Sequence, residues 1–369
     1  MLKTLNVINK HALEKSTPIS LRDFYRGGKQ VTNYIVLRQA QFLEHELPIR
    51  LSKRISDLHN FPSSLANIHN LQSVHETYLD SLEILVNYPE IKTLEDALEY
   101  KDKLQQLLTK HGDVEMNVAK ALQFYKKNYI ADYKSNRGMI NDKLNLFYSS
   151  RVGIRLLVNN FISNCENGTG ILREFDPATI CHNAISELKN MFTLNSMGLY
   201  IPEINITHKN GGNITYLPSH LHYIYFEVIK NAIIAYNRNL IYDGKIDIVI
   251  CNTGDYLCVK ISDNAGGIPY NDLYKLFSYF YTKNEFRDDK NTEKRKRFEG
   301  LGLMMDTEGM IDGFNPYYGQ GHGLGLSRLY AKYFGGDLNV NSIYGIGTDV
   351  HIYISKLESS SENVCDVKT

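Results

Sequence analysis

Glu227 and Asn231 lie four residues apart in a stretch, 219–239, that the sequence predicts to be helical. At this spacing the two side chains share one face of the helix, about one turn apart. A carboxylate and an amide oxygen placed together suit a hard cation such as Mg²⁺, or a proton-accepting role beside one. Taken alone, such a pair is more often part of a solvated helix face.

Asp263 follows a strand-like run, 257–261, and is followed by Gly266 and Gly267. A carboxylate at the end of a strand can accept a hydrogen bond from the amino group of a purine. Glycines beside it allow the backbone to approach a flat ring closely. A glycine-rich turn with an Asx cap explains the same residues equally well.

Four glycines occupy alternate positions from Gly319 to Gly325 and run directly into a predicted amphipathic helix, 324–334. Exposed amides at a helix N-terminus, with the helix dipole behind them, bind anions such as phosphates. Alternating glycines also occur in plain turns, but the helix and the strand beginning at Leu338 favour a phosphate site. Further on, the turn 345–349 holds Thr348, which can bond a base directly or through water.

The elements that must position these residues are predicted from periodicity. Between about residues 20 and 161, four amphipathic segments follow one another, with breaks at 59–62 and 87–89, which is typical of a helical bundle. After a polar linker at 164–170, alternating β-branched runs at 246–250, 257–261 and 350–354 indicate strands. Helical stretches at 182–192, 219–239 and 324–334 lie between them, so we expect an α/β domain with a mixed sheet.

Composition narrows the classes of function. Lys and Arg together number 41, as do Asp and Glu, so no overall charge attracts nucleic acid or an anionic membrane, and we expect neither as a partner. No apolar run approaches the ~20 residues that span a bilayer. The five cysteines, an odd number without CxxC spacing, suggest reduced thiols in an intracellular compartment. Residues 1–19 are compatible with an organellar leader.

The order of the motifs is more informative than any one of them: an acid/amide helix, Asp-x-x-Gly-Gly, a glycine-loop helix, then Gly-x-Gly-Thr. This order resembles the four boxes of the GHKL ATPases, which include histidine kinases, gyrase-type topoisomerases and heat-shock chaperones. Ser-Ser-Arg-Val-Gly-Ile-Arg-Leu-Leu at 149–157 resembles one branch, the mitochondrial 2-oxoacid dehydrogenase kinases. Further matches to that branch lie at 37–39, 46–51, 111–114 and 327–338.

The resemblance implies a two-domain fold, α plus α/β. An N-terminal four-helix bundle at 20–164 would bind a lipoyl domain, and a GHKL-type α/β sandwich at 171–357 would bind ATP and Mg²⁺ under a lid at 284–318, before a tail at 358–369. The family's kinases phosphorylate serines on the decarboxylase α subunit of a 2-oxoacid dehydrogenase complex in the mitochondrial matrix and thereby inactivate it. We expect the pyruvate complex, with the branched-chain complex as the alternative. A homodimer is implied too.

The roles of single residues follow from the same resemblance. Glu227 would be the general base that orients or deprotonates the substrate serine, Asn231 would hold Mg²⁺, and Asp263 would bind adenine. The phosphates would be held by backbone amides in the stretch that contains Gly319, Gly321, His322, Gly323, Leu324 and Gly325. Lys230, Gly267, Thr282 and Thr348 complete the expected nucleotide contacts, although Lys230 could equally be a surface lysine.

The chain departs from the family pattern at three positions. The family's His four residues before the base is Tyr223 here, with His222 one step earlier, and its first glycine after the Asp is Ala265. Ile234 stands where the family usually has Arg. The chain also contains no Trp, so it lacks the C-terminal Asp-Trp with which pyruvate-type members cross over in the dimer.

Other functions remain open on the sequence. A histidine kinase needs a phosphoacceptor His on its dimerisation helix, and the segment 147–157 has none. Chaperone and mismatch-repair ATPases share the boxes but not an N-terminal bundle of this kind. The alternative that is not an enzyme is a catalytically weak, lipoyl-domain-binding regulator. It is motivated by the three departures and opposed by the intact Glu227, Asn231 and Asp263.

Overall fold

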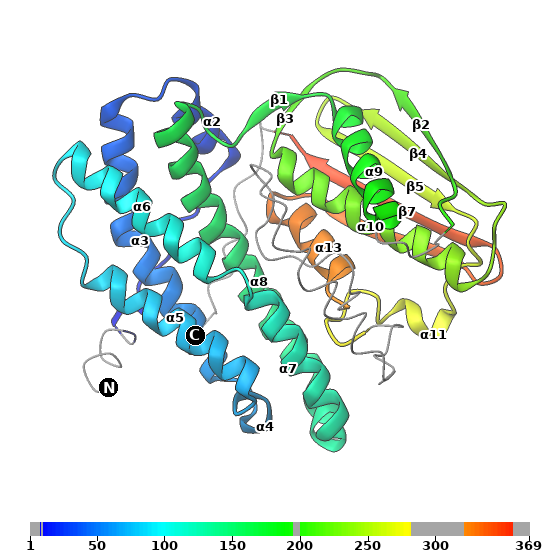
Figure 1. Cartoon of the computed structure of the whole chain (residues 1–369), viewed down its shortest axis with the longest axis horizontal. Coiled ribbons are helices and arrows are strands. Elements are labelled where there is room, and N and C mark those ends of the chain that lie inside the picture. Colours follow the sequence, from blue (N-terminus) through cyan, green and yellow to red (C-terminus); the bar gives the residue numbers. More distant parts are fainter. Residues whose placement is uncertain (1–7, 9, 195–199, 282–320, 357–369) are drawn as a thin grey trace.

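The computed structural model describes residue 8 and residues 10–194, 200–281 and 321–356. These residues form a helical half and an α/β half that lie side by side, as the sequence predicted (Figure 1). The predicted lid at 284–318 and the tail at 358–369 lie outside the described residues, as do residues 1–7 and 9 of the expected leader. No helix in the described ranges combines the length and apolar character needed to cross a membrane.

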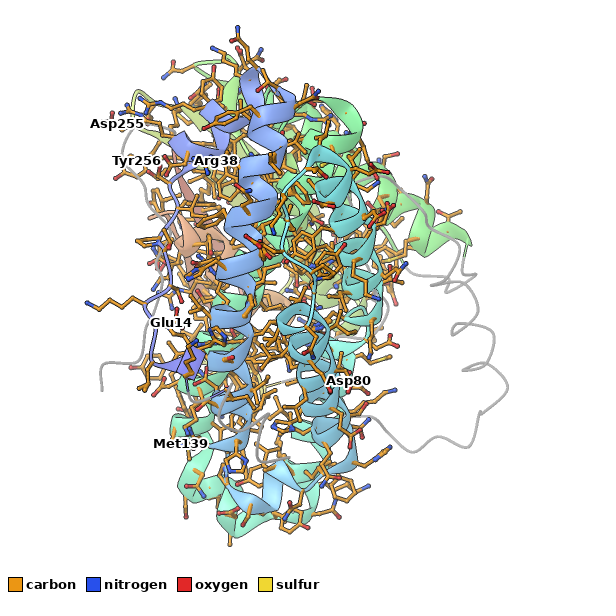
Figure 2. The ribbon with its side chains drawn as sticks, turned by 90° about the vertical axis from the view of Figure 1, so that its left-hand side faces the viewer. Glu14, Arg38, Asp80, Met139, Asp255 and Tyr256 are labelled. Atoms are coloured by element: carbon orange, nitrogen blue, oxygen red, sulfur yellow. The ribbon has the colours of Figure 1, made fainter. Side chains whose placement is uncertain are left out.

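Five long helices build most of the helical half. Its elements are α2 (Leu21–Lys29), α3 (Asn33–His59), α4 (Ser63–Ala66), α5 (His69–Val86), α6 (Leu94–Lys110), α7 (Val114–Asn128) and α8 (Ile130–Asn167). The predicted breaks are confirmed, because α3 ends at His59 and α5 at Val86. Each long helix contributes side chains that are at most 2% exposed, among them Leu47, Tyr78, Leu104, Val118 and Phe147. Arg38, near the start of α3, and Met139, on α8, lie toward opposite ends of the bundle (Figure 2).

Local sequence signals explain where helices begin and end. Thr93 and Asp96 form a capping box at the start of α6: the Asp96 amide donates to Thr93 Oγ1 at 3.2 Å, and the Thr93 amide donates to Asp96 Oδ2 at 2.7 Å. Such reciprocal bonds satisfy amides that the first turn of a helix leaves without partners. At the C-terminal end of α8, the residue that follows the helix is Gly168, whose left-handed backbone (φ 62°) suits glycine.

The bundle core is not uniformly apolar. It contains a partly open pocket of about 40 Å³ that is lined largely by leucines together with Tyr78, Ser81, His111, Arg151 and Arg155. The buried charge of Arg151 is paired, since its guanidinium donates to the carbonyl of His111 at 2.8 Å and to Glu115 at 3.3 Å. Burial, with the nearby charge of Arg151, lowers the pKa of His111 to about 3, so this imidazole is neutral at neutral pH.

The second half contains a five-stranded mixed sheet, covered on one face by helices, and a separate two-stranded antiparallel sheet. Its strands are β1 (Arg173–Phe175), β2 (Glu203–Lys209), β3 (Ile214–Tyr216), β4 (Lys245–Asn252), β5 (Tyr256–Asp263), β6 (Asp337–Ile343) and β7 (Gly347–Ser355). Its helices are α9 (Pro177–Leu194), α10 (Pro218–Arg238), α11 (Tyr270–Leu273) and α13 (Gly323–Tyr333). The five-stranded sheet has the order β2-β4-β5-β7-β6, and only β2 and β4 pair in parallel. The predicted strands fall within these elements, and the predicted helices match α9, α10 and α13, with the predictions 219–239 and 324–334 each extending one residue past the observed C-terminal end.

Alternation along the strands decides which face is covered. Ile246, Ile248 and Ile250 of β4 are fully buried, whereas the residues between them are partly exposed. The buried face supports α10 and α13, and α13 lies between the sheet and α8 of the helical half (Figure 1). Because α10 carries Glu227 and α13 begins at the glycine loop, this layer positions the predicted site.

Just beyond the C-terminal end of α10, one residue has a backbone conformation that favours glycine. Leu240 has φ 57° and its side chain is 69% exposed. We expect Leu240→Gly to stabilise the fold by up to about 1 kcal/mol, because the strain of a left-handed L-residue is removed and little buried area is lost. Chemical denaturation measures this. The control, Leu98→Gly on α6, is also a partly exposed leucine (42% exposed), but in a helix interior, and should destabilise by roughly 1 kcal/mol. Equal losses in both variants would contradict the interpretation.

Candidate active site

Glu227 is a buried carboxylate with a buried cationic partner. Its side chain on α10 is 2% exposed, as is that of Lys230 one turn later. The ammonium of Lys230 donates to Glu227 Oε1 and also lies over the ring of Phe226, 5.3 Å from its centroid. The interpretation of Lys230 as a surface lysine is therefore wrong, because its side chain is buried. The pairing has a physical reason, since a carboxylate that is removed from water needs a partner of opposite charge.

The second oxygen of Glu227 faces the start of α13. A Cβ added to Gly323 would lie 1.8 Å from Glu227 Oε2, so only glycine fits between this backbone and the carboxylate. The first bond within α13 runs from the Leu326 amide to the carbonyl of His322 at 2.8 Å. The amides of Gly323, Leu324 and Gly325 thus precede the hydrogen-bonded ladder of the helix, where amides attract anions. The structure places the start of α13 beside Glu227.

Asn231 lies one turn beyond Glu227 on α10. Its side chain is exposed, in contrast to the buried Glu227 and Lys230. The amide oxygen is therefore open to a ligand at the border of the site. An exposed amide oxygen is a suitable ligand for a hard cation such as Mg²⁺.

Asp263 and Thr348 meet through strand pairing. They are opposite each other in the register of β5 and β7, and Thr348 Oγ1 is 2.9 Å from Ser342 Oγ. Asp263 Oδ1 accepts a hydrogen bond from the Ala265 amide at 2.9 Å. Burial raises the pKa of Asp263 above its usual value, and hydrogen bonds from the backbone of Ala265 and Thr348 offset part of that rise. A desolvated acceptor of this kind suits a hydrogen-bond donor such as an amino group on a flat ring.

The two glycines after Asp263 have backbone conformations that L side chains rarely adopt. Gly266 has φ 87° and Gly267 has φ 68°, and a Cβ on Gly267 would lie 2.1 Å from the carbonyl oxygen of Ile343. Ala265 is not among the non-glycine residues with positive φ, and its carbonyl accepts from Asn239 Nδ2 at 2.5 Å. The departure at Ala265 therefore costs no backbone strain, whereas the other two positions require glycine.

The other departures lie around α10. The His222 imidazole is 3.2 Å from Glu187 of α9 and so does not pair with Glu227. Tyr223, four residues before Glu227, is buried and packs against Tyr330 of α13, with 4.9 Å between ring centroids. Ile234 is half-buried on the same helix. Lys230, not a histidine, is the partner of Glu227 in this structure.

Thr282 and Gly319, two predicted nucleotide contacts, lie outside the described residues, whereas Gly321 precedes α13 in a left-handed conformation (φ 81°). Sequence reasoning missed Tyr236 and Asn239, which hold the Asp263 loop. The Asn264 amide donates to the Tyr236 hydroxyl at 2.9 Å. Their spacing offered a weak signal, since Tyr236 lies in the last turn of α10, Asn239 directly follows the helix, and residues three apart share a helix face.

Comparisons with known proteins agree with this geometry. Residues 18–173 match the model of the mitochondrial branched-chain alpha-ketoacid dehydrogenase kinase, and residues 216–358 match that of the histidine kinase-, DNA gyrase B- and HSP90-like ATPase. The rat protein named [pyruvate dehydrogenase (acetyl-transferring)] kinase isozyme 4 is 30% identical, over 94% of this chain and 82% of its own length. The chain belongs to the mitochondrial 2-oxoacid dehydrogenase kinase family.

Other relatives extend the family to plants. The Arabidopsis thaliana protein named mitochondrial [pyruvate dehydrogenase (acetyl-transferring)] kinase is 29% identical over 96% of this chain and 94% of its own length. Among solved structures, the catalytic domain of histidine kinase ThkA matches 50% of this chain and 97% of its own, at 14% identity and a TM-score of 0.34. That structural likeness is too slight to add to the assignment, which depends on the family members.

The contact between Gly323 and Glu227 yields a direct test. We expect Gly323→Ala to reduce ATP binding and phosphoryl transfer by at least roughly a hundredfold, because a Cβ 1.8 Å from Oε2 displaces either α13 or the carboxylate. ATP titration and a kinase assay measure the loss. The control is Gly138→Ala on α8, where a Cβ meets nothing within 4 Å, and it should leave both quantities unchanged. Normal activity of Gly323→Ala would show that the contact is unimportant.

Proposed function

We propose that this chain is a protein-serine kinase that uses Mg-ATP to phosphorylate, and so inactivate, the decarboxylase α subunit of the pyruvate dehydrogenase complex. The observation that carries the proposal is the contact between a buried carboxylate, Glu227, and the amide-bearing start of α13 at Gly323. If those amides bound the phosphates of ATP, the terminal phosphorus would lie near the carboxylate. Phosphoryl transfer needs mainly positioning and charge neutralisation, and this arrangement supplies both.

In this proposal each residue has one role. Glu227 orients or deprotonates the substrate serine, and Lys230 holds Glu227 in place by pairing with its other oxygen. Asn231 binds Mg²⁺ beside the phosphates, and the ion would neutralise part of their charge. Asp263 accepts a hydrogen bond from the adenine amino group, with Gly267 and Thr348 lining the same pocket. Thr282 and Gly319 complete the proposed nucleotide contacts.

The protein substrate and partners are proposed from the relatives. The pyruvate complex is favoured because the relatives at 29–31% identity are named for it, and the branched-chain complex is the alternative because the model matching residues 18–173 is named for that one. We further propose that the bundle at 20–164 binds the lipoyl domain of the complex core, that the ATP-binding domain spans 171–357, and that the protein works as a homodimer in the mitochondrial matrix. The relatives are named as mitochondrial.

Transfer of labelled phosphate decides between a kinase and a regulator without catalysis. The protein is incubated with labelled ATP, Mg²⁺ and recombinant decarboxylase α subunits of both complexes. We expect serine labelling of the pyruvate-type subunit. Glu227→Gln should lower the rate by a factor of about 10² to 10⁴ while ATP binding persists, since a general base typically contributes that much. Intact ATP binding without labelling of either subunit would disprove the kinase; labelling of the branched-chain subunit alone would reassign the substrate.

The proposed metal ligand is tested separately. We expect Asn231→Ala to abolish measurable Mg-ATP binding in a calorimetric titration, because the nucleotide phosphates lose the cation that Asn231 holds. Titration of ATP with a chelator present should show little difference between this variant and the wild type. His222→Ala, on the same helix but facing Glu187 of α9, serves as the control. Unchanged Mg-ATP affinity in Asn231→Ala would remove Asn231 from the metal site.

A further inference from the structure

His322 joins the glycine loop to the helical half of the molecule. It directly precedes Gly323, and its side chain is 2% exposed. Its Nδ1 is 3.1 Å from the hydroxyl of Tyr148 on α8, and its ring packs edge-on against Tyr148 and Tyr279 at centroid distances of 5.7 and 5.3 Å. The backbone of this stretch faces Glu227 while the imidazole of His322 lies among side chains of the bundle and of the segment before residue 282.

Tyr148 is one member of a stripe on α8. Asn141, Asn145 and Tyr148 are spaced by four and three residues, so they share one face of the helix. The amide of Tyr279 donates to Asn141 Oδ1 at 3.0 Å, and the hydroxyl of Tyr279 donates to Asn145 Oδ1 at 2.9 Å. The stripe thus makes three polar contacts with the α/β half: two with Tyr279 and one with His322.

Tyr279 in turn contacts α13. A Cβ added to Gly325 would lie 3.2 Å from the ring of Tyr279, close enough that the first turn of α13 cannot move toward it freely. Gly323 is confined more tightly on its other side, where an added Cβ would lie 1.8 Å from Oε2 of Glu227. The amides at the start of α13 therefore lie between a catalytic group on α10 and aromatic side chains held by α8.

We propose that His322 is a positioning residue, through which the α8 stripe of Asn141, Asn145 and Tyr148 sets the place of the phosphate-binding amides against Glu227. The side chain of His322 would not contact nucleotide. From the proposed function this inference takes only that the ligand is ATP. It does not depend on which protein receives the phosphate. It implies that the helical half completes the nucleotide site and is more than a docking module attached to it.

The hydrogen bond between His322 and Tyr148 does not depend on pH in the neutral range. Burial lowers the pKa of His322 to about 4, and a backbone hydrogen bond at Tyr279 opposes part of that shift. The imidazole is consequently neutral at the pH of the cell. A neutral ring nitrogen and a phenol can exchange donor and acceptor roles by tautomer, so the hydrogen bond between them persists across the neutral range.

Removing one hydroxyl tests the inference with little change of shape. Tyr148→Phe should raise the dissociation constant of Mg-ATP and the KM for ATP roughly five- to tenfold, the effect of leaving a buried nitrogen without its partner. His322→Phe should do the same, and Tyr148→Phe made in that background should have no further effect. His322→Asn, which places an amide near the position of Nδ1, should restore affinity to within about twofold of the wild type.

The control is Tyr100→Phe, which removes a hydroxyl from an equally buried tyrosine of α6, 1% exposed. It should leave ATP affinity unchanged. Tyr279→Phe, which breaks the bond to Asn145, is a second variant should Tyr148→Phe fail to fold, and it should weaken ATP binding similarly. Thermal melting of every variant separates loss of fold from loss of affinity.

Two outcomes would overturn the inference. One is an ATP affinity in folded Tyr148→Phe and Tyr279→Phe equal to that of the wild type. The other is an equal loss in Tyr100→Phe, which would mean that any buried hydroxyl has the same effect. Both outcomes are measured by titrating each variant with ATP in the absence of a protein substrate. A wild-type protein that binds ATP but labels neither α subunit would disprove the proposed kinase and still leave this inference open to test.

Discussion

The close contact between the Glu227 carboxylate and the backbone of Gly323 constrains the rest of the structure. A side chain at Gly323 would displace either α13 or the carboxylate, because an added Cβ would lie 1.8 Å from Glu227 Oε2. Both helices pack on the covered face of the sheet, to which β4 and β5 contribute their alternating buried side chains. The contact between Glu227 and Gly323 therefore depends on how the two helices pack on that face. The buried Lys230 makes the contact tolerable by pairing with the carboxylate that the contact removes from water.

The departures from the family pattern look less severe in three dimensions than along the chain. Ala265 does not have a positive φ, so an alanine there adds no backbone strain. Tyr223 fills space beneath Tyr330, and the polar partner that a histidine would have supplied to Glu227 is replaced by Lys230. A carboxylate paired with a buried ammonium is still an acceptor on its second oxygen. These positions therefore argue less strongly for a protein without catalysis than the sequence alone suggested.

Much of this could be predicted because it is local. The helical period placed Glu227 and Asn231 on one face, alternation predicted β4, β5 and β7, and the predicted breaks at 59–62 and 87–89 coincide with real helix ends. Other features depend on distant parts of the chain. The pairing of Asp263 with Thr348 needs a strand register, and the bond between Tyr148 and His322 joins residues in different halves. No local pattern predicts burial either, so the sequence leaves open whether Lys230 contacts nucleotide or lies at the surface.

Both ends of the proposed nucleotide pocket belong to the α/β half, but one of them also contacts the helical half. Asp263 and Thr348 belong to adjacent strands, and their separation is fixed by the hydrogen-bonded ladder of one sheet. The amides of α13 rest partly on tyrosines that contact α8. A molecule spanning both ends would restrict the movement of the two halves relative to each other, and part of its binding free energy would offset that lost entropy. Linkage then requires the reverse: whatever already restrains the halves makes the pocket bind more tightly.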